Sequence, residues 1–167
     1  GLATRDPLKC TFRGRFISVE GPDGAGKSTQ VQRIAAFLKE QGYTVELLRE
    51  PGGTPLGEKL RELLLHFPAS PPTVEAEALL YAASRAQLIR ERIQPALDEG
   101  RWVLCDRYVY ASFAYQGYGY QLPLEWIAQI NRLALKQMMP DRTYLLDVPL
   151  EVARRRLAQR EAAAPDR

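Results

Sequence analysis

The chain has 167 residues, of which 46% are hydrophobic and 26% are charged, a composition typical of one globular domain with a buried core. Its formal net charge of +3 is spread along the chain, so charge gives little support to a nucleic-acid-binding protein. No segment reaches the roughly 20 apolar residues of a membrane-spanning helix, and residues 1–14 contain no apolar secretory signal. Two cysteines make no disulfide framework, and Cys105, inside an apolar run, is expected to be buried. We therefore expect a protein of the reducing cytoplasm that binds neither nucleic acid nor membrane.

Short β-rich runs alternate with longer helical patterns, which predicts βα units and a parallel sheet. Pro95 is expected to kink or interrupt the longest helix, because proline lacks a backbone N–H. Residues 1–14 are predicted to form a flexible extension, and residues 15–167 the folded domain. In chain order the patterns predict a strand at 15–20, a helix at 27–41, a strand at 44–49, helices at 54–65 and 73–99, a strand at 102–105, helices at 109–114 and 124–137, a strand at 143–147 and a helix at 150–160.

The most specific feature is a glycine-rich segment between the first strand and the first helix. It has the pattern G-x-x-x-x-G-K-[ST], in which backbone N–H groups and a helix N-terminus surround the phosphates of a nucleotide. Lys27 would reach the β- and γ-phosphates, and the Ser28 hydroxyl would bind Mg²⁺. The segment predicts a site for a nucleoside triphosphate without deciding between a kinase, a motor and a switch. The residues expected to bind the nucleotide are Gly21, Pro22, Asp23, Gly24, Ala25, Gly26, Lys27, Ser28 and Thr29.

Four further clusters lie where a kinase with this loop has its second substrate. They are REPGGT at 49–54, LLYAASR at 79–85, DRY at 106–108 followed by AYQG at 114–117, and LDVP at 146–149. In open α/β sheets, ligands bind beyond the carboxyl ends of the strands, where the first and third clusters are predicted to lie. With these elements in this order, residues 16–167 closely resemble the bacterial thymidylate kinase family.

The resemblance implies an α/β fold of the P-loop NTPase type, with three αβα layers and a parallel sheet flanked by helices. It implies that dTMP is phosphorylated to dTDP with MgATP, in dTTP synthesis for DNA replication. The implied partners are the small molecules ATP and dTMP, and the implied assembly is a homodimer. The family continues beyond this point with the rest of a lid, a final strand and a C-terminal helix, so we expect the chain to lack those elements.

The third and second clusters supply the expected substrate contacts. Tyr81 and Arg85 share one helix face, because they are four residues apart. By resemblance Tyr81 stacks on thymine and Arg85 hydrogen-bonds the base; a core tyrosine and a solvated arginine are the alternative. Arg107 is expected to bind phosphate, since a guanidinium matches phosphate oxygens bidentately. Asp106 either organises Mg²⁺ through water or orients Arg107, and Ser112 is placed among the substrate-binding residues.

The other assignments on the acceptor side also come from the resemblance. Asp23 resembles the carboxylate that reads the sugar 3′-hydroxyl. Tyr115 and Gln116 resemble residues that line the deoxyribose and the base. Glu50 and Pro51 are expected to shape the acceptor site, and Pro51 is a candidate for a cis peptide bond.

A lid arginine is expected to complete the catalytic set. Gly24 stands where some members of the family have an arginine in the loop, and members with glycine there take the transition-state arginine from the lid after LDVP. Arg160 is the arginine predicted for this role, alongside Lys27 and Arg107, with residues 154–156 also basic. An arginine supplied in cis is worth about 10³-fold or more in rate. The alternative is a solvated charge at a helix end.

Three other functions stay open at this point: another monophosphate kinase, a deoxynucleoside kinase that acts on the free nucleoside, and a regulatory nucleotide-binding module. A deoxynucleoside kinase would need a general base near the 5′-hydroxyl, and Glu50 is placed for that role, although REPGGT and AYQG count against it. A regulatory module that holds ATP without transferring phosphate would leave Tyr81, Arg85 and Arg107 without a function. A phosphate acceptor needs no general base, because a monoester with a second pKa of about 6 is mostly anionic at neutral pH.

Overall fold

The computed structural model describes residues 13–67, 69–119 and 121–163, apart from the side chains of Tyr115 and Tyr118. None of the helices in these ranges has the length and apolar character of a bilayer-spanning segment. The elements in chain order are β1 (Phe16–Glu20), α1 (Lys27–Glu40), β2 (Val45–Arg49), α2 (Pro55–Leu65), α3 (Val74–Leu88), the π-helical turn η1 (Ile89–Ile93), α4 (Gln94–Asp98), β3 (Trp102–Asp106), α5 (Val109–Ser112), the π-helical segment η2 (Phe113–Gly119), α6 (Leu124–Leu135), β4 (Arg142–Leu145) and α7 (Leu150–Ala163).

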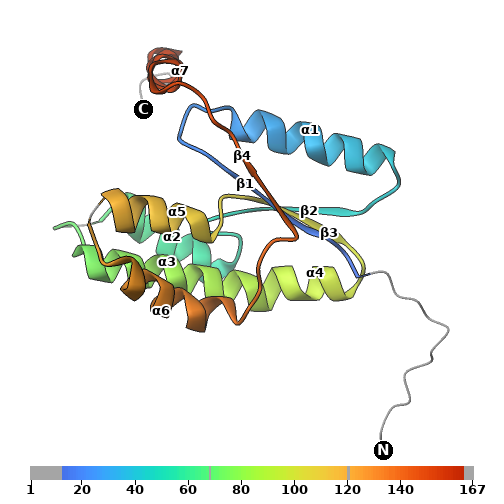
Figure 1. Cartoon of the computed structure of the whole chain (residues 1–167), viewed down its shortest axis with the longest axis horizontal. Helices are drawn as coiled ribbons and strands as arrows, with labels where there is room; N and C mark the ends of the chain where they lie inside the picture. The colour runs from blue at the N-terminus through green and yellow to red at the C-terminus, as the bar shows by residue number, and fades with distance from the viewer. Residues whose placement is uncertain (1–12, 68, 120, 164–167) are drawn as a thin grey trace, which may run out of the picture.

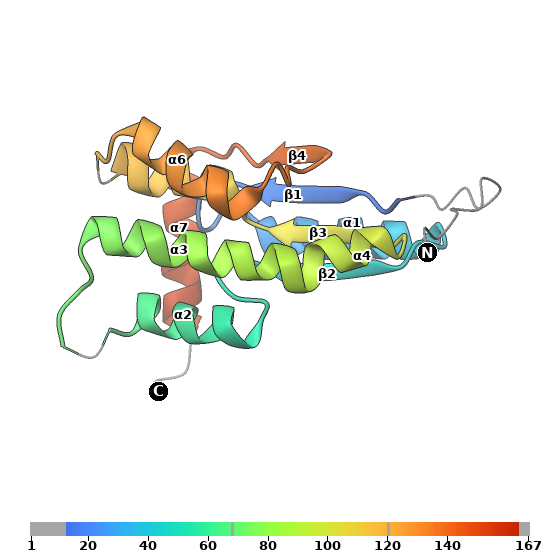
Figure 2. The ribbon, with the colours of Figure 1, turned by 90° about the horizontal axis from the view of Figure 1, so that it is seen from below.

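The four strands form one parallel sheet in the order β2-β3-β1-β4. Helix α1 covers one face of the sheet, and α3 to α6 cover the other, with α2 packed against α3 (Figure 1, Figure 2). This is the predicted α/β fold with helices on both sides of a parallel sheet. Because every strand runs in the same direction, the carboxyl ends of β1, β2 and β3 meet at one edge, where the sequence motifs begin.

The central strand β1 is buried along its whole length, and its alternating side chains face different layers. Phe16 belongs to the apolar cluster under α3 and α4, whereas Ile17 and Val19 belong to the cluster under α1. Ser18 and Glu20 lie on the same side of the strand as Phe16, because they follow it at a spacing of two. This places a carboxylate inside the helical layer at the end of β1. At the edge of the sheet, all four residues of β4 are exposed.

The long helix predicted at 73–99 is continuous but not uniformly α-helical. It runs as α3 to Leu88, passes through the π-helical turn, and ends as α4 at Asp98. The Gln94 N–H donates to the carbonyl of Ile89, five residues earlier. The turn lies directly before Pro95, which cannot donate a hydrogen bond and whose ring crowds the carbonyl four residues before it. The predicted interruption therefore takes the form of one widened turn.

Four predicted elements have boundaries that differ from those in the structure. The helix expected to end at residue 114 continues as η2 to Gly119, because Gly117 packs closely on α6: a Cβ there would lie 2.4 Å from Leu124 Cδ2. Helix α6 ends at Leu135, two residues early, since Lys136 and Gln137 adopt left-handed φ angles of 43° and 68°. The last strand is Arg142–Leu145 rather than 143–147, and α7 extends to Ala163.

Part of the predicted N-terminal extension belongs to the packed domain. Residues 1–12 lie outside the described residues. Gly14, in contrast, is buried, and its N–H donates to the carbonyl of Leu97 at 3.0 Å. A Cβ at Gly14 would lie 1.8 Å from the carbonyl oxygen of Arg101, so a side chain has no room there. Cys105 is fully buried, as predicted.

Candidate active site

The glycine-rich segment forms the connection between β1 and α1, as predicted; residues 21–28 are called the P-loop below. Gly26 adopts a φ of 92° and is the N-cap of α1, so the loop leads directly into the helix N-terminus. Lys27 is 7% exposed, and its Nζ donates to the carbonyl of Pro22 at 3.0 Å. Burial lowers the pKa of Lys27, and the charges of Asp106 and Glu20 oppose that effect. The lysine charge is therefore held close to the loop that would surround a phosphate.

Helix α7 packs directly on the P-loop at Gly24. This residue has a φ of 81°, and a Cβ there would lie 2.5 Å from the carbonyl oxygen of Ala153. The Arg156 side chain donates to the carbonyl of Gly24 at 3.3 Å. A side chain at position 24 would push α7 away from the P-loop. Glycine at this position therefore leaves room for the arginine-bearing helix α7 to lie against the loop.

Two adjoining cavities open at the carboxyl ends of the strands. The first has a volume of about 380 Å³ and the second about 250 Å³, and both reach Asp23, Glu50, Pro51, Tyr81 and Arg107. The first also contains four P-loop residues and two further predicted residues: Gly24, Gly26, Lys27, Ser28, Asp106 and Arg160. The second also contains Arg85, Ser112 and Gln116. The structure thus brings together residues from all the predicted clusters except the LDVP segment.

A third cavity of about 710 Å³ lies on the other side of the P-loop, along α1 and α7. It is lined by Ala25, Gly26 and Thr29 of the P-loop region and by residues 145–148. Arg160 lines both this cavity and the first one, so it lies at their junction. Its positive charge is also close enough to lower the pKa of Lys27. Arg154 and Arg155 line none of the three cavities.

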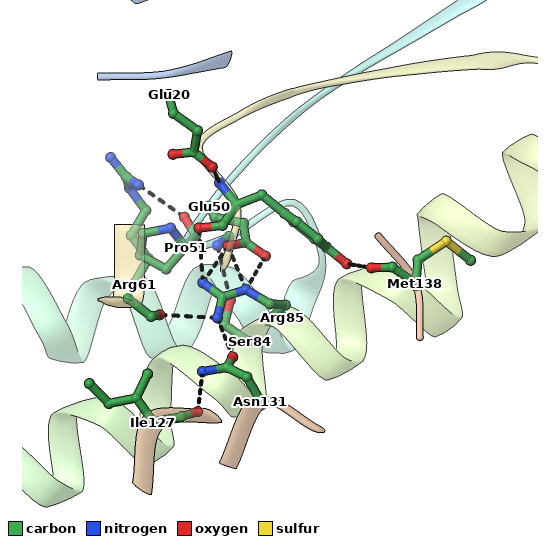
Figure 3. Close-up of polar contacts among 12 residues, drawn as sticks. Glu20, Glu50, Pro51, Arg61, Ser84, Arg85, Ile127, Asn131 and Met138 are labelled. Atoms are coloured by element: carbon green, nitrogen blue, oxygen red, sulfur yellow. Dashed lines mark hydrogen bonds and ion pairs between the residues drawn. The ribbon is translucent and has the colours of Figure 1, made fainter. Parts of the chain in front are cut away.

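Arg85 occupies the centre of a buried polar network between α3, α5, α6 and the end of β2 (Figure 3). Its side chain is 1% exposed, and its Nη2 lies 2.7 Å from Glu50 Oε2. Nε donates to both oxygens of Glu50 at 2.9 Å. Nη1 donates to Ser112 Oγ at 3.0 Å and Asn131 Oδ1 at 2.5 Å, and Nη2 to the Tyr108 carbonyl at 3.4 Å. Arg85 is therefore neither solvated nor a simple surface charge.

The N–H donors of Arg85 already have partners, which affects the predicted contact of Arg85 with a base. A guanidinium has five N–H donors, and the contacts of Arg85 use all of them. The longest is the 3.4 Å contact to the Tyr108 carbonyl, the one most easily exchanged for a ligand oxygen. Burial raises the pKa of Glu50, and the positive charge of Arg85 opposes this rise. Glu50 and Pro51 are joined by a cis peptide bond, as expected.

Arg107 and Asp23, which line both cavities, form an ion pair. Asp23 Oδ1 is also 3.8 Å from Lys27 Nζ. Burial raises the pKa of Asp106, and the charges of Lys27 and Arg61 act in the opposite direction. These contacts place two cations and two carboxylates around one cavity, a suitable surface for a phosphate and a divalent cation together.

The oxygen donors of the first cavity suit Mg²⁺. Ser28 and Asp106 both line it, one with a hydroxyl and the other with a carboxylate. Mg²⁺ keeps several waters and is usually held by one or two protein oxygens plus substrate phosphates, which matches this sparse donor set. Among the described residues, no group of three or more His, Cys, Asp or Glu side chains could hold a metal alone.

Three polar residues outside the predicted clusters lie in or beside the site. Arg61 of α2 lines the first cavity and donates to the Pro51 carbonyl at 2.9 Å. Glu77 lines the second cavity, and burial raises its pKa. Glu20 accepts a hydrogen bond from the Tyr108 N–H. Only Glu20 had a visible signal, namely a carboxylate at the end of a mostly apolar strand, whereas Arg61 and Glu77 depend on how α2 and α3 pack.

Two predicted residues lie elsewhere. Gly21 and Pro22 line none of the three cavities; Gly21 instead packs against residue 146, where a Cβ would lie 2.8 Å from the carbonyl oxygen. The side chain of Tyr115 lies outside the described residues, so its role stays a prediction. Gln116 is 1% exposed, and its Oε1 is the one buried side-chain oxygen without a hydrogen-bond partner in the described part of the chain.

Comparison with known proteins agrees with this geometry. The family model described as thymidylate kinase matches residues 19–166. A thymidylate kinase of Bordetella pertussis is 53% identical over 149 residues, covering 89% of this chain and 70% of the relative. Thymidylate kinases of Thermomicrobium roseum and Exiguobacterium sibiricum are 53% and 48% identical, each over 89% of this chain, and over 69% and 70% of their own lengths. The chain therefore belongs to the thymidylate kinase family.

Proposed function

We propose that this protein transfers the γ-phosphoryl group of MgATP to dTMP and so supplies dTDP for dTTP synthesis. The observation that carries the proposal is the first cavity, which is lined by Lys27 and Ser28 of the P-loop and by Arg61 and Arg107. A loop for the phosphates of the donor and an arginine pair for the phosphate of the acceptor thus meet in one place. The adjoining second cavity extends to Tyr81, Arg85 and Gln116 and offers room for a nucleoside.

The proposed chemistry depends on position and charge. The acceptor phosphate, with a second pKa of about 6, is already a nucleophile at neutral pH, so no base has to remove a proton. Lys27 and Arg107 would hold the donor and acceptor phosphates, and Arg160 would stabilise the charge that develops between them. Ser28 and Asp106 would hold Mg²⁺, which would supply positive charge beside the donor phosphates. Orientation of Arg107 is the alternative role of Asp106.

The second cavity is the proposed site for the deoxynucleoside. The ring of Tyr81 would stack on thymine, and Arg85 would exchange its long contact to the Tyr108 carbonyl for a base oxygen. The free Oε1 of Gln116 could accept the base N–H, which would satisfy an otherwise unpaired buried oxygen. Asp23 would read the 3′-hydroxyl beside Arg107. Glu50, Pro51, Ser112 and Tyr115 would complete the walls around the sugar and base.

The geometry favours a monophosphate acceptor over a free nucleoside. A deoxynucleoside kinase would use Glu50 as a base for the 5′-hydroxyl. Both oxygens of Glu50 are held by Arg85, and the residue is 6% exposed, so its carboxylate is committed to the ion pair. Arg61 and Arg107 in the same cavity would have no phosphate to bind if the acceptor were thymidine.

We also propose that the protein acts in the cytoplasm as a homodimer. Large apolar side chains are exposed on α2, α3 and α6, the helices on the outer side of the helical layer (Figure 2). Such side chains on neighbouring helices favour burial against another protein surface. The ones that support the proposal are Leu56, Leu63, Leu79, Trp126 and Leu133.

The test is ADP release from MgATP with a panel of acceptors: dTMP, dUMP, UMP, CMP, AMP, GMP and thymidine. The proposal predicts turnover with dTMP and, at most, a slower reaction with dUMP. Lys27→Met should lower the dTMP-dependent rate by about 10²-fold or more, because it removes a charge that stabilises the transferring phosphoryl group. Turnover with thymidine but not dTMP would show that the enzyme is a nucleoside kinase. ADP release that is the same with and without every acceptor would contradict the proposal.

A further inference from the structure

Glu20 is a buried carboxylate at the carboxyl end of the central strand. It is 4% exposed, and its Oε1 accepts a hydrogen bond of 2.8 Å from the backbone N–H of Tyr108. Figure 3 shows it on the opposite side of the polar network from Asn131, above Glu50. Burial of a carboxylate is unfavourable unless its hydrogen bonds offset the loss of water, so its presence needs a physical reason. A smaller or apolar residue would fill the end of a parallel strand without that cost.

Glu20 holds the turn that follows β3. Arg107 has a left-handed φ of 68°, a conformation that costs a non-glycine residue about 1–2 kcal/mol. Its own N–H donates to the Val19 carbonyl at 3.0 Å. This backbone contact does not depend on which side chain is present at position 19. The next N–H, that of Tyr108, finds its acceptor only in the Glu20 side chain. The last two residues of β1 therefore fix both amides of this turn.

The far end of Tyr108 is also fixed. Its hydroxyl donates to the Met138 carbonyl at 2.7 Å, and its ring lies edge-on to Phe16 with centroids 4.9 Å apart. Tyr108 is thus held by the core through its ring and by Glu20 through its backbone. Arg107 lies between this anchor and β3, and its side chain, which is 23% exposed, extends to the two cavities.

Glu20 does not line either of the two cavities that contain Arg107. A ligand in those cavities would therefore meet Arg107 and not Glu20. We propose that Glu20 is a positioning residue, which holds the Tyr108 N–H so that the left-handed turn at Arg107 directs the guanidinium onto the acceptor phosphate. The inference rests on the proposed function, since it requires that Arg107 bind the phosphate of dTMP.

Two nearly isosteric substitutions separate positioning from packing. Glu20→Gln keeps an oxygen acceptor for Tyr108, whereas Glu20→Met keeps the volume but removes the acceptor. The measurements are the dissociation constants of dTMP and of thymidine by calorimetry, with the melting temperature of each variant as a check on folding. Thymidine has the same base and sugar but no phosphate, so its binding does not include the proposed contact between Arg107 and the phosphate.

The inference predicts that Glu20→Met weakens dTMP binding by about tenfold, the equivalent of about 1.4 kcal/mol or one lost hydrogen bond. Thymidine binding should change by less than about twofold, and Glu20→Gln should restore dTMP binding to within about threefold of the wild type. In an Arg107→Ala background, Glu20→Met should have no further effect on dTMP, because the two residues act through one contact.

Equal losses for dTMP and thymidine, or additive losses in the double variant, would overturn the inference and leave the proposed function standing. A wild-type protein that binds thymidine and dTMP equally would overturn the proposed function, and the inference with it. If Glu20→Met does not fold, Glu20→Gln replaces it in the comparison. Any loss of dTMP affinity caused by Glu20→Gln in the wild type must then be absent when the same substitution is made in the Arg107→Ala variant.

Discussion

Replacing Arg85 with leucine should destabilise the protein more than any other single change of a charged residue in the described chain. The substitution removes a guanidinium that is 1% exposed and leaves Glu50, 6% exposed, without its cation at 2.7 Å. It also removes the donors to Ser112 and Asn131. Both consequences act in the same direction, because each leaves a buried polar group without a partner.

The expected size follows from the burial of the pair. Breaking a buried ion pair by removing one partner costs about 3–5 kcal/mol, whereas a domain is typically stable by about 5–15 kcal/mol. Arg85→Leu should therefore remove a third or more of the free energy of unfolding. Adding Glu50→Leu should recover part of this loss, since apolar residues that replace both members of a buried pair are often neutral.

Urea unfolding of four proteins provides the assay: wild type, Arg85→Leu, the double variant and Arg90→Leu. Arg90 lies one turn further along the same helix and is exposed, so its replacement should change stability by less than about 0.5 kcal/mol. A loss below about 1 kcal/mol for Arg85→Leu, or a double variant no more stable than the single one, would refute the importance of the buried pair.

Three other predictions concern the lid arginine, the P-loop and the buried carboxylate of β1. Arg160→Ala should lower kcat by about 10³-fold while leaving ATP affinity within about threefold, measured by steady-state kinetics and calorimetry; an unchanged kcat would rule out its catalytic role. Gly24→Ala should weaken the contact between the loop and α7, because the new Cβ would lie 2.5 Å from the Ala153 carbonyl, and should make α7 more accessible to proteolysis than in wild type. Burial raises the pKa of Glu20 from its ordinary 4.5 to about 7, with Glu50 adding to the rise and Arg85 and Arg107 opposing it. The stability due to this shift is complete below the unfolded pKa and is lost as the pH rises through 7. Between pH 8 and pH 5, the free energy of unfolding of the wild type without Mg²⁺ should therefore rise by about 2–3 kcal/mol more than that of Glu20→Gln. Equal pH profiles of the two proteins in urea unfolding would contradict this prediction.

The sequence predicted best those features that depend on neighbours along the chain. The P-loop follows from residues 21–28 alone, because its glycines and the following helix make a complete local structure. The i, i+4 spacing of Tyr81 and Arg85 likewise placed both residues at the second cavity. Gly24 could be identified as a departure from other members of the family, but its contact with Ala153 appears only when α7 is placed.

Features that depend on tertiary packing could not be read from the sequence. The complete burial of Arg85 requires Glu50, which directly follows β2, and Asn131 of α6, which are 35 and 46 residues away. Arg61 lines the first cavity and donates to the Pro51 carbonyl, a contact that depends on how α2 packs beside the end of β2. Gly117 lies inside a helical segment despite its low helix propensity, because it packs against Leu124.

The most direct test of the proposed reaction follows the phosphoryl group itself. The purified protein is mixed with ATP labelled at the γ-phosphate, Mg²⁺ and dTMP, and the products are separated by chromatography. The proposed function predicts that the label appears in dTDP, at the rate of ADP formation and with no lag. Label found only in inorganic phosphate, or only in ATP, would contradict the assignment of this chain as a dTMP kinase.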